Sequence, residues 1–82
     1  MWFVYVLLCS DGSLYTGSTN NLEKRLLDHQ NGRGGRYTRS HKPIRMVYFE
    51  KLATKSTALK REIEIKSWKR ETKIEALRLK LS

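Results

Sequence analysis

An unbroken apolar octapeptide near the start of the chain constrains the fold more than any other segment. The residues from Trp2 to Cys9 (WFVYVLLC) are aromatic, β-branched or aliphatic, a composition that favours a β-strand. A strand with one wet face would alternate apolar and polar residues, so this continuous hydrophobicity predicts a central strand covered on both faces. Asp11-Gly12 directly afterwards is a strong turn signal, and residues 13–18 (SLYTGS) predict the returning strand.

The length of the turn decides which side chains share a face of this hairpin. A two-residue turn would put Tyr5 and Tyr15 on opposite faces of the sheet. A three-residue loop, residues 10–12 with Gly12 in the left-handed conformation, would pair Tyr5 with Gly17 and bring Tyr15 to the same face as Tyr5. We predict the three-residue loop.

A helix, a loop and a third strand are predicted next. Asn20, with Glu23 three residues later, reads as a capping box that opens a helix over about residues 21–31. The stretch 31–42 (NGRGGRYTRSHK) is rich in glycine and basic residues without helical periodicity, which predicts an exposed loop. Residues 44–50 (IRMVYFE) predict the third strand.

Two further helices are predicted in the last third of the chain. Thr54 or Ser56 can cap a helix that continues to about residue 69. A short terminal helix is indicated by apolar residues at three- and four-residue steps, Ile74, Leu77 and Leu81. The order strand, strand, helix, strand, helix, helix within 82 residues predicts one α+β domain over residues 1–82.

Basic residues outnumber acidic residues by 17 to 8, which gives a formal net charge of +9 and a pI of about 10.1. The excess lies in residues 24–45 and 55–82, after a nearly neutral start. This distribution predicts a folded domain that presents a cationic surface to a polyanion. A solvated basic face without a specific partner is the alternative.

The cysteine content and the length of the longest apolar run predict a cytoplasmic protein. Its single cysteine, Cys9, rules out an internal disulfide and fits a reducing compartment. The apolar run 2–9 is too short to span a membrane. It also lacks the basic start and the small-residue cleavage site of a signal peptide. We therefore expect a cytoplasmic location and no membrane segment.

One carboxylate falls among apolar residues on the second predicted helix. At about 100° per residue, four residues define the apolar arc of this helix: Ala58, Leu59, Ile63 and Ile65. Glu62 falls inside this arc, whereas Glu64 projects to the far side. A carboxylate directed toward a core must be compensated. The compensation is either a salt bridge to Lys66 or a hard divalent ion such as Mg²⁺, which needs only one or two protein carboxylates.

A cation, an imidazole and two phenols are further candidates for a site. Arg25 and His29 lie four residues apart and so share one helix face. Arginine offers bidentate geometry to a phosphate oxygen, although a solvated helix face would also accommodate Arg25, and His29 alone could be a partly buried histidine. Tyr5 and Tyr15 could be plain sheet packing. Beside a metal ion and an arginine, a phenol ionises more easily and could take a proton from water.

The order and spacing of these residues resemble the GIY-YIG nuclease superfamily, most closely its small stand-alone bacterial members. The matching segments are Phe3-Val4-Tyr5, Tyr15-Thr16-Gly17, Arg25 with His29, and the helical stretch 58–70 that contains Glu62. The resemblance implies a small three-stranded antiparallel sheet flanked by helices. It also implies a divalent-metal-dependent endonuclease that hydrolyses DNA phosphodiester bonds, with structure-specific cleavage and DNA repair or recombination among its roles.

The resemblance further implies a role for each matching residue. Tyr5 is the favoured general base, and Tyr15 lines the site and orients water or phosphate. Arg25 would stabilise negative charge on the scissile phosphate, and His29 would contact the phosphate or the nucleophile. Glu62 would hold the single metal ion, Mg²⁺ or Mn²⁺.

Two departures from the family pattern bear on the expected substrate. Phe3 replaces the glycine of the first motif, which other members tolerate. The chain also lacks an appended DNA-reading domain or zinc module, which predicts weak or structure-dependent substrate choice. Backbone phosphates would be gripped by Arg33, Arg36, Arg39 and Lys66. The expected partner of this monomer is DNA, with RNA and a targeting protein left open. The alternative function is a non-catalytic nucleic-acid-binding module with a vestigial nuclease site.

Overall fold

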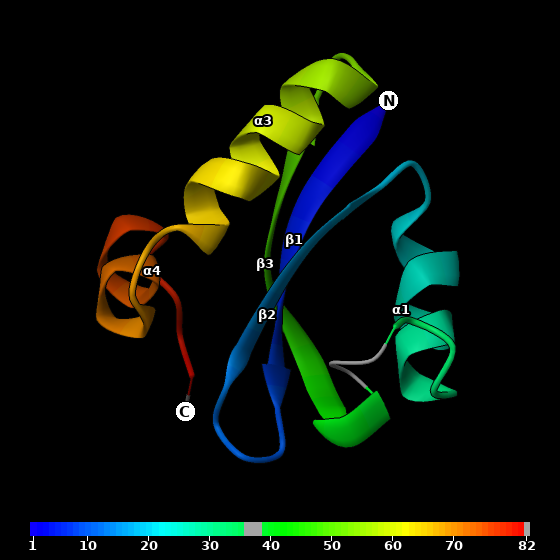
Figure 1. Ribbon diagram of the computed structural model, residues 1–82, viewed down its shortest axis with the longest axis vertical. Coiled ribbons are helices and arrows are strands. Elements are labelled where there is room, and N and C mark those ends of the chain that lie inside the picture. The colour runs from blue at the N-terminus through cyan, green and yellow to red at the C-terminus, as the bar shows by residue number, and fades with distance from the viewer. Residues whose placement is uncertain (36–38, 82) are drawn as a thin grey trace.

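The computed structural model describes residues 1–35 and 39–81 and confirms the α+β fold (Figure 1). Three antiparallel strands form the sheet in the order β2-β1-β3. Helix α1 lies on one side of the sheet, and helices α3 and α4 lie on the other (Figure 1). The elements are β1 (Trp2–Cys9), β2 (Leu14–Thr19), α1 (Leu22–Gln30), β3 (Pro43–Leu52), α3 (Lys55–Lys66) and α4 (Arg70–Ala76). Strand β3 extends past the predicted range 44–50 at both ends.

Strand β1 is central, as its continuous hydrophobicity predicted. Val4 and Val6 are fully buried in a core that includes Ala58 and Ile65 of α3. Burial of each such aliphatic side chain stabilises the fold by about 1.5–3 kcal/mol. Because side chains alternate along a strand, the equally buried Tyr5 faces the other side of the sheet, toward α1. The central strand therefore carries the apolar core on one face and a buried polar side chain on the other.

The hairpin between β1 and β2 has the predicted three-residue loop. The backbone N–H of Cys9 donates to the carbonyl of Ser13 at 2.9 Å, and that of Gly12 donates to the carbonyl of Cys9 at 2.9 Å. Gly12 has a φ of 84°, the left-handed conformation that this loop requires. Tyr5 consequently pairs with Gly17 across the two strands.

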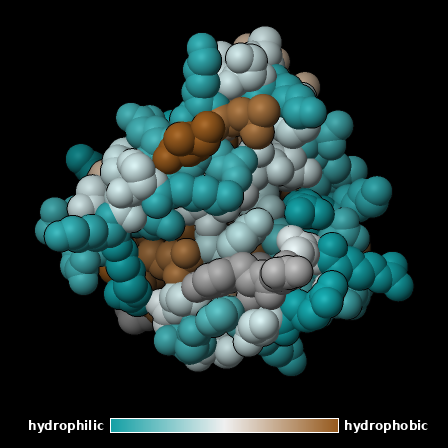
Figure 2. All heavy atoms as spheres, in the orientation of Figure 1, coloured by the Kyte–Doolittle hydropathy of each residue, from teal (hydrophilic) through white to brown (hydrophobic). Residues whose placement is uncertain are grey.

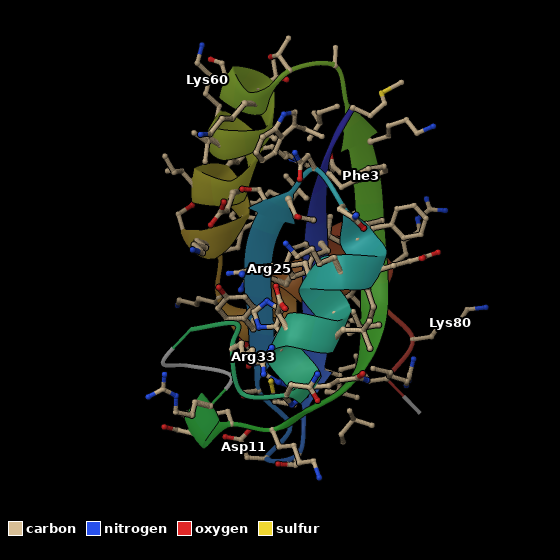
Figure 3. All side chains as sticks on the ribbon, turned by 90° about the vertical axis from the view of Figure 1, so that its right-hand side faces the viewer. Phe3, Asp11, Arg25, Arg33, Lys60 and Lys80 are labelled. Carbon is tan, nitrogen blue, oxygen red and sulfur yellow. The ribbon has the colours of Figure 1, made fainter. Side chains whose placement is uncertain are left out.

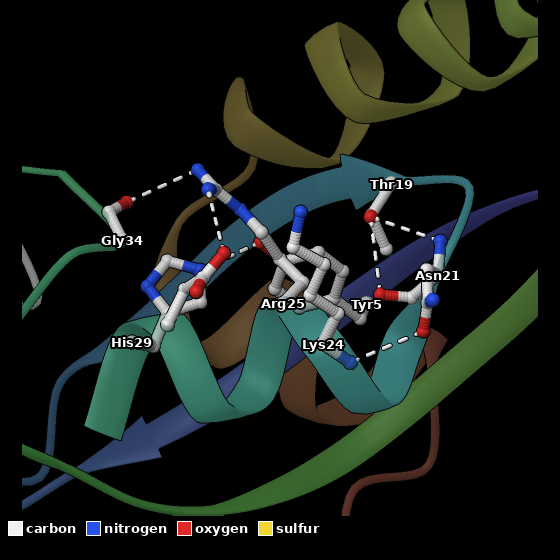
Figure 4. A network of polar contacts seen from close by, with 8 residues as sticks. Tyr5, Thr19, Asn21, Lys24, Arg25, His29 and Gly34 are labelled. Atoms are coloured by element: carbon white, nitrogen blue, oxygen red, sulfur yellow. Dashed lines mark hydrogen bonds and ion pairs between the residues drawn. The ribbon is translucent and has the colours of Figure 1, made fainter. Parts of the chain in front are cut away.

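The predicted capping box of Asn20 with Glu23 is wrong, because the helix starts one position later. Asn21 is the N-cap of α1, and its side-chain oxygen accepts a hydrogen bond from the backbone N–H of Lys24 at 3.1 Å (Figure 4). Thr19, the last residue of β2, accepts a hydrogen bond from the Asn21 N–H at 3.1 Å. Because this contact ties Asn21 to the end of β2, Asn21 rather than Asn20 caps the helix.

Helix α3 begins at one of the two predicted caps. Thr54 is its N-cap, and the side chains of Thr54 and Thr57 each accept a hydrogen bond from the other's backbone N–H. The helix ends at Lys66, earlier than the predicted residue 69, and Ser67 donates its hydroxyl to the Glu64 carbonyl at 2.6 Å. This side-chain bond satisfies a carbonyl at the end of the helix and closes it.

Half of the predicted apolar arc of α3 lies in solvent. Ala58 and Ile65 are fully buried, but Leu59 is 42% exposed and Ile63 is 69% exposed. Figure 2 shows the corresponding hydrophobic patch over α3. Only the narrow face of α3 that carries Ala58 and Ile65 packs on the sheet. The predicted apolar arc was therefore too wide.

The segment after α3 completes the core. Helix α4 ends at Ala76, so Leu77 and Leu81, which the predicted terminal helix included, lie beyond the helix that is observed. Leu77 and Leu79 are buried, and Arg78 between them has a φ of 52°. No helix in residues 1–35 or 39–81 is long and apolar enough to cross a membrane.

Candidate active site

Polar side chains from two strands and one helix meet on the α1 side of the sheet. The hydroxyl oxygen of Tyr5 lies 2.7 Å from Nε2 of His29, and both side chains are buried (Figure 4). The Tyr15 ring lies 6.4 Å from the Tyr5 ring and 5.1 Å from the His29 ring, measured between centroids. Arg25 lies one helical turn before His29. The three-residue hairpin loop is what puts the two phenols together.

Burial keeps both partners of the Tyr5–His29 hydrogen bond neutral. It raises the pKa of Tyr5 to about 12, and the nearby Arg25 guanidinium opposes this shift without cancelling it. Burial, assisted by the Arg25 charge, lowers the pKa of His29 to about 4. Arg25 thus acts on Tyr5 in the predicted direction. A neutral phenol beside a neutral imidazole is nevertheless the form present at neutral pH.

The loop after α1 covers the imidazole at Gly34, a residue that the sequence reasoning did not single out. A Cβ atom at Gly34 would overlap Nδ1 of His29, so only glycine fits against this ring. Nη2 of Arg25 donates to the carbonyl oxygen of Gly34 at 3.2 Å, and Nη1 lies 4.0 Å from Asp28 (Figure 4). These contacts hold the guanidinium over His29. The sequence feature that could have indicated this close contact is the presence of three glycines among residues 32–35.

Glu62 reaches the site from the α3 side of the sheet. Ser18, which pairs with Val4 across β2 and β1, donates its hydroxyl to Oε1 of Glu62 at 2.5 Å. The other oxygen, Oε2, lies 2.6 Å from Nζ of Lys66. The salt bridge offered as one explanation for Glu62 is therefore present. The Glu62 side chain is 15% exposed, so the carboxylate is partly accessible to solvent.

The site surrounds the outer strand β2 rather than occupying a single face. Nζ of Lys66 lies 5.8 Å from the centroid of the Tyr15 ring, which connects the ion pair to the aromatic cluster. The Glu62 charge also contributes to raising the pKa of Tyr5, although less than burial does. The five predicted residues thus converge on the edge of the sheet from both sides.

The donor set fits a hard divalent ion and does not fit a protein-enclosed metal cage. Within the described residues, no group of three or more His, Cys, Asp or Glu side chains comes together. Glu62 therefore offers a single, partly exposed carboxylate whose Oε2 already faces a cation. Mg²⁺ accepts this arrangement because waters and substrate phosphate can fill the rest of its shell.

The structure describes three of the four residues that were predicted to bind backbone phosphates. Arg33 is exposed in the loop that follows α1 and lies on the same side of the molecule as Arg25 (Figure 3). Arg39 is exposed as well, but residues 39 and 40 are helical, so the predicted loop over residues 31–42 is wrong at these two positions. The Lys66 side chain is 48% exposed. Arg36 lies outside the described residues. Their contact with nucleic acid stays a prediction.

A lysine is buried beside this site, and its burial was not predicted from the sequence. Lys73 of α4 is 8% exposed, and its Nζ donates to Oγ1 of the buried Thr16 at 3.1 Å. Burial, together with the charge of Lys66, lowers the pKa of Lys73. The available signal was the four-residue step from Lys73 to the buried Leu77, which puts both on one helix face.

The low pKa of His29 predicts an acid-sensitive fold. Between pH 6.5 and about 4 the unfolded chain binds a proton on His29 that the folded chain excludes. Stability is therefore complete above pH 6.5 and falls as the pH drops toward 4, by about 3 kcal/mol at 1.36 kcal/mol per pKa unit. Urea unfolding of the wild type and of His29→Gln across this range measures the difference. Equal slopes against pH would contradict the prediction, and His41→Gln is the control.

Comparisons with known proteins match this chain to one family. A family model described as the GIY-YIG catalytic domain matches residues 1–75. A UPF0213 protein from Staphylococcus saprophyticus is 47% identical over 75 residues, which cover 92% of each chain. A UPF0213 protein from Haloquadratum walsbyi is 51% identical over 71 residues, 87% of this chain and 80% of that one. The solution NMR structure of a UPF0213 protein from Bacillus halodurans has a TM-score of 0.60 at 37% identity, over 95% of this chain and 84% of that chain.

Proposed function

This chain belongs to the GIY-YIG catalytic domain family, and we propose that it is a divalent-metal-dependent endonuclease that hydrolyses DNA phosphodiester bonds. One observation carries the proposal. A hydrogen-bonded phenol and imidazole, Tyr5 and His29, lie under Arg25, and the Glu62 carboxylate stands across the edge of β2. A proton acceptor, a fixed cation and a metal ligand are the groups that hydrolysis of a phosphodiester needs.

Tyr5 and His29 act together as the general base in the proposed reaction. As Tyr5 removes a proton from the attacking water, it passes its own proton to Nε2 of the neutral His29. The two proton transfers are coupled along the 2.7 Å contact. A phenolate is then never required as the resting form, which agrees with the raised pKa of Tyr5. Tyr15 lines the site and orients the water or phosphate.

Arg25 and Glu62 stabilise the charge that develops on the phosphate. The Arg25 side chain is 35% exposed, so its guanidinium is fixed by Gly34 yet accessible to a phosphate oxygen. Glu62 would hold Mg²⁺ or Mn²⁺. Such an ion, when bound, polarises the phosphate and stabilises the leaving oxygen. Tyr5, Arg25 and Glu62 thus divide the proton transfer and the charge stabilisation between them.

The charge distribution supports nucleic acid as the substrate. The net charge of +9 favours a polyanion, and phosphates along the strand would contact Arg33, Arg36, Arg39 and Lys66. These contacts read the backbone rather than the bases, so cleavage depends on DNA structure more than on sequence. Such a preference suits a cytoplasmic monomer that acts in DNA repair or recombination.

A non-catalytic nucleic-acid-binding module is the second candidate. The ion pair of Glu62 with Lys66 favours it, because a carboxylate already neutralised by a lysine does not need a metal ion for its stability. This candidate predicts salt-dependent binding to nucleic acid without cleavage of any substrate.

Cleavage assays separate the two candidates. Wild-type protein is incubated with supercoiled plasmid and with single-stranded, flapped and branched DNA or RNA, with Mg²⁺ or with chelator. We expect cleavage only with the metal ion. Arg25→Ala, purified in the same way, should cleave about 100- to 1,000-fold more slowly, as is typical when one charge-stabilising donor is removed. Equal cleavage by both proteins would identify a contaminating nuclease, and binding without cleavage would favour the second candidate.

A further inference from the structure

The two oxygens of Glu62 are held by donors of very different kinds. Ser18 is a neutral donor on strand β2, and its short side chain is fixed by the sheet. Lys66 is a cation at the end of a long, flexible stem, and its side chain is about half exposed. The Ser18 contact orients the carboxylate. The Lys66 contact neutralises it and can be exchanged.

Two groups besides Glu62 act on the ammonium group of Lys66. The Tyr15 ring, a wall of the proposed site, lies 5.8 Å from Nζ. The charge of Lys66 also acts on the buried Lys73, where it helps to lower the pKa of that lysine. Besides Glu62, Lys66 therefore has a ring face within reach and a like charge that repels it, so Glu62 is not the only group that acts on its ammonium group.

We propose that Lys66 is an exchangeable internal cation of the active site. In the free protein it pairs with Oε2 of Glu62, the oxygen that Ser18 does not bind. When a divalent ion binds Glu62, the ammonium group moves out over Tyr15 and binds a phosphate of the substrate. This inference rests on the metal site of the proposed function and adds to it the regulation of that site by the polyanion.

The exchange makes metal and nucleic acid bind cooperatively. Metal binding alone must break the Lys66–Glu62 pair, so Lys66 weakens the affinity of the free protein for the metal ion. A phosphate draws Lys66 away from Glu62 and removes that competition. By linkage, the metal ion raises the affinity for nucleic acid by the same factor. A lysine that only stabilised the helix would weaken neither ligand's binding.

Metal affinity in the absence of nucleic acid tests the first step. Mn²⁺ is titrated into wild type, Lys66→Gln, Lys60→Gln and Glu62→Gln, and free Mn²⁺ is read from its electron paramagnetic resonance signal. Lys60 is exposed in the middle of the same helix, away from Arg25, and provides the control for lost net charge (Figure 3). We expect Lys66→Gln to bind Mn²⁺ about threefold or more tighter than Lys60→Gln does, since even an exposed pair at this spacing contributes about twofold.

The outcomes separate this inference from the proposed function. Equal Mn²⁺ affinities in Lys66→Gln and Lys60→Gln, with Mn²⁺ binding lost in Glu62→Gln, would overturn the exchange alone. Equal affinities in wild type and Glu62→Gln would overturn the metal site and the exchange with it. Circular dichroism of each variant checks that the fold is intact.

Affinity for a fluorescein-labelled DNA duplex tests the second step. Its dissociation constant is measured by anisotropy with chelator and with Ca²⁺, another ion that prefers oxygen ligands. We expect Ca²⁺ to tighten binding by a larger factor in wild type and Lys60→Gln than in Lys66→Gln, which has no cation to release. The same factor in all three proteins would overturn the proposed coupling.

Discussion

Replacement of Glu62 by glutamine is expected to lower metal-dependent cleavage by about 10³-fold or more while the fold persists. The amide keeps the shape of the side chain and an oxygen that can accept the Ser18 hydroxyl, but it removes the charge that would hold a divalent ion. Metal ions contribute several kcal/mol to stabilisation of phosphoryl transition states, and each 1.36 kcal/mol is tenfold in rate. Single-turnover cleavage under saturating Mg²⁺ measures the loss.

Glu64→Gln is the matched control for this variant. Glu64 lies on the same helix with its side chain 55% exposed, and it pairs with Arg61 at 2.7 Å rather than with any residue of the site. We expect its cleavage rate to equal that of wild type. Urea unfolding should show that both variants lose no more than about 1 kcal/mol, the usual range for partly exposed ion pairs. A Glu62→Gln rate within tenfold of wild type would remove Glu62 from the metal site.

Gly17→Ala is expected to damage both the fold and the site. A Cβ atom at this position would lie 2.6 Å from Cζ of Tyr5 and would overlap the phenol oxygen. Tyr5 is buried in the central strand, so its ring cannot swing into solvent to make room. We expect a loss of about 1–3 kcal/mol from overpacking. We also expect a large fall in cleavage, because the displaced phenol loses its contact with His29.

Tyr5→Phe provides the internal control for this steric argument. It removes the oxygen that a Cβ at Gly17 would meet most closely. The double variant should therefore be destabilised by less than the sum of the two single variants, a difference that urea unfolding of all four proteins measures. A Gly17→Ala protein as stable as wild type would show that the sheet accommodates the methyl group. Additive effects would show that the phenol oxygen is not the obstacle.

Features that depend on local sequence were predicted well. The octapeptide of β1 indicated a central strand because no charged residue interrupts it, and the loop at Gly12 fixed the pairing of Tyr5 with Gly17. These signals act over a few residues, so no knowledge of distant contacts was required. Family resemblance then gave a role to each candidate site residue. The geometry brings Tyr5, Tyr15, Arg25 and His29 together, with Glu62 at the edge.

Features set by contacts between distant segments were missed. The burial of Lys73 depends on Thr16, which lies more than fifty residues earlier in the chain. The fit of Gly34 against His29 depends on how the loop folds back on α1. The exposure of Ile63 depends on how little of α3 the small sheet can cover. Periodicity within one helix indicates at most that Lys73 shares a face with Leu77, and it does not reveal these contacts between distant segments.

The central position of β1 has a consequence for the growing chain. β1 emerges from the ribosome with its hairpin partner β2 close behind, but Trp2 pairs on its other side with Leu52. At about 5–20 residues per second, that partner follows only after a few seconds, whereas a hairpin forms within microseconds. Until then Val4 and Val6 lack their cover from α3, and one edge of β1 stays unpaired. We therefore expect the half-synthesised chain to be more prone to aggregate than the finished protein.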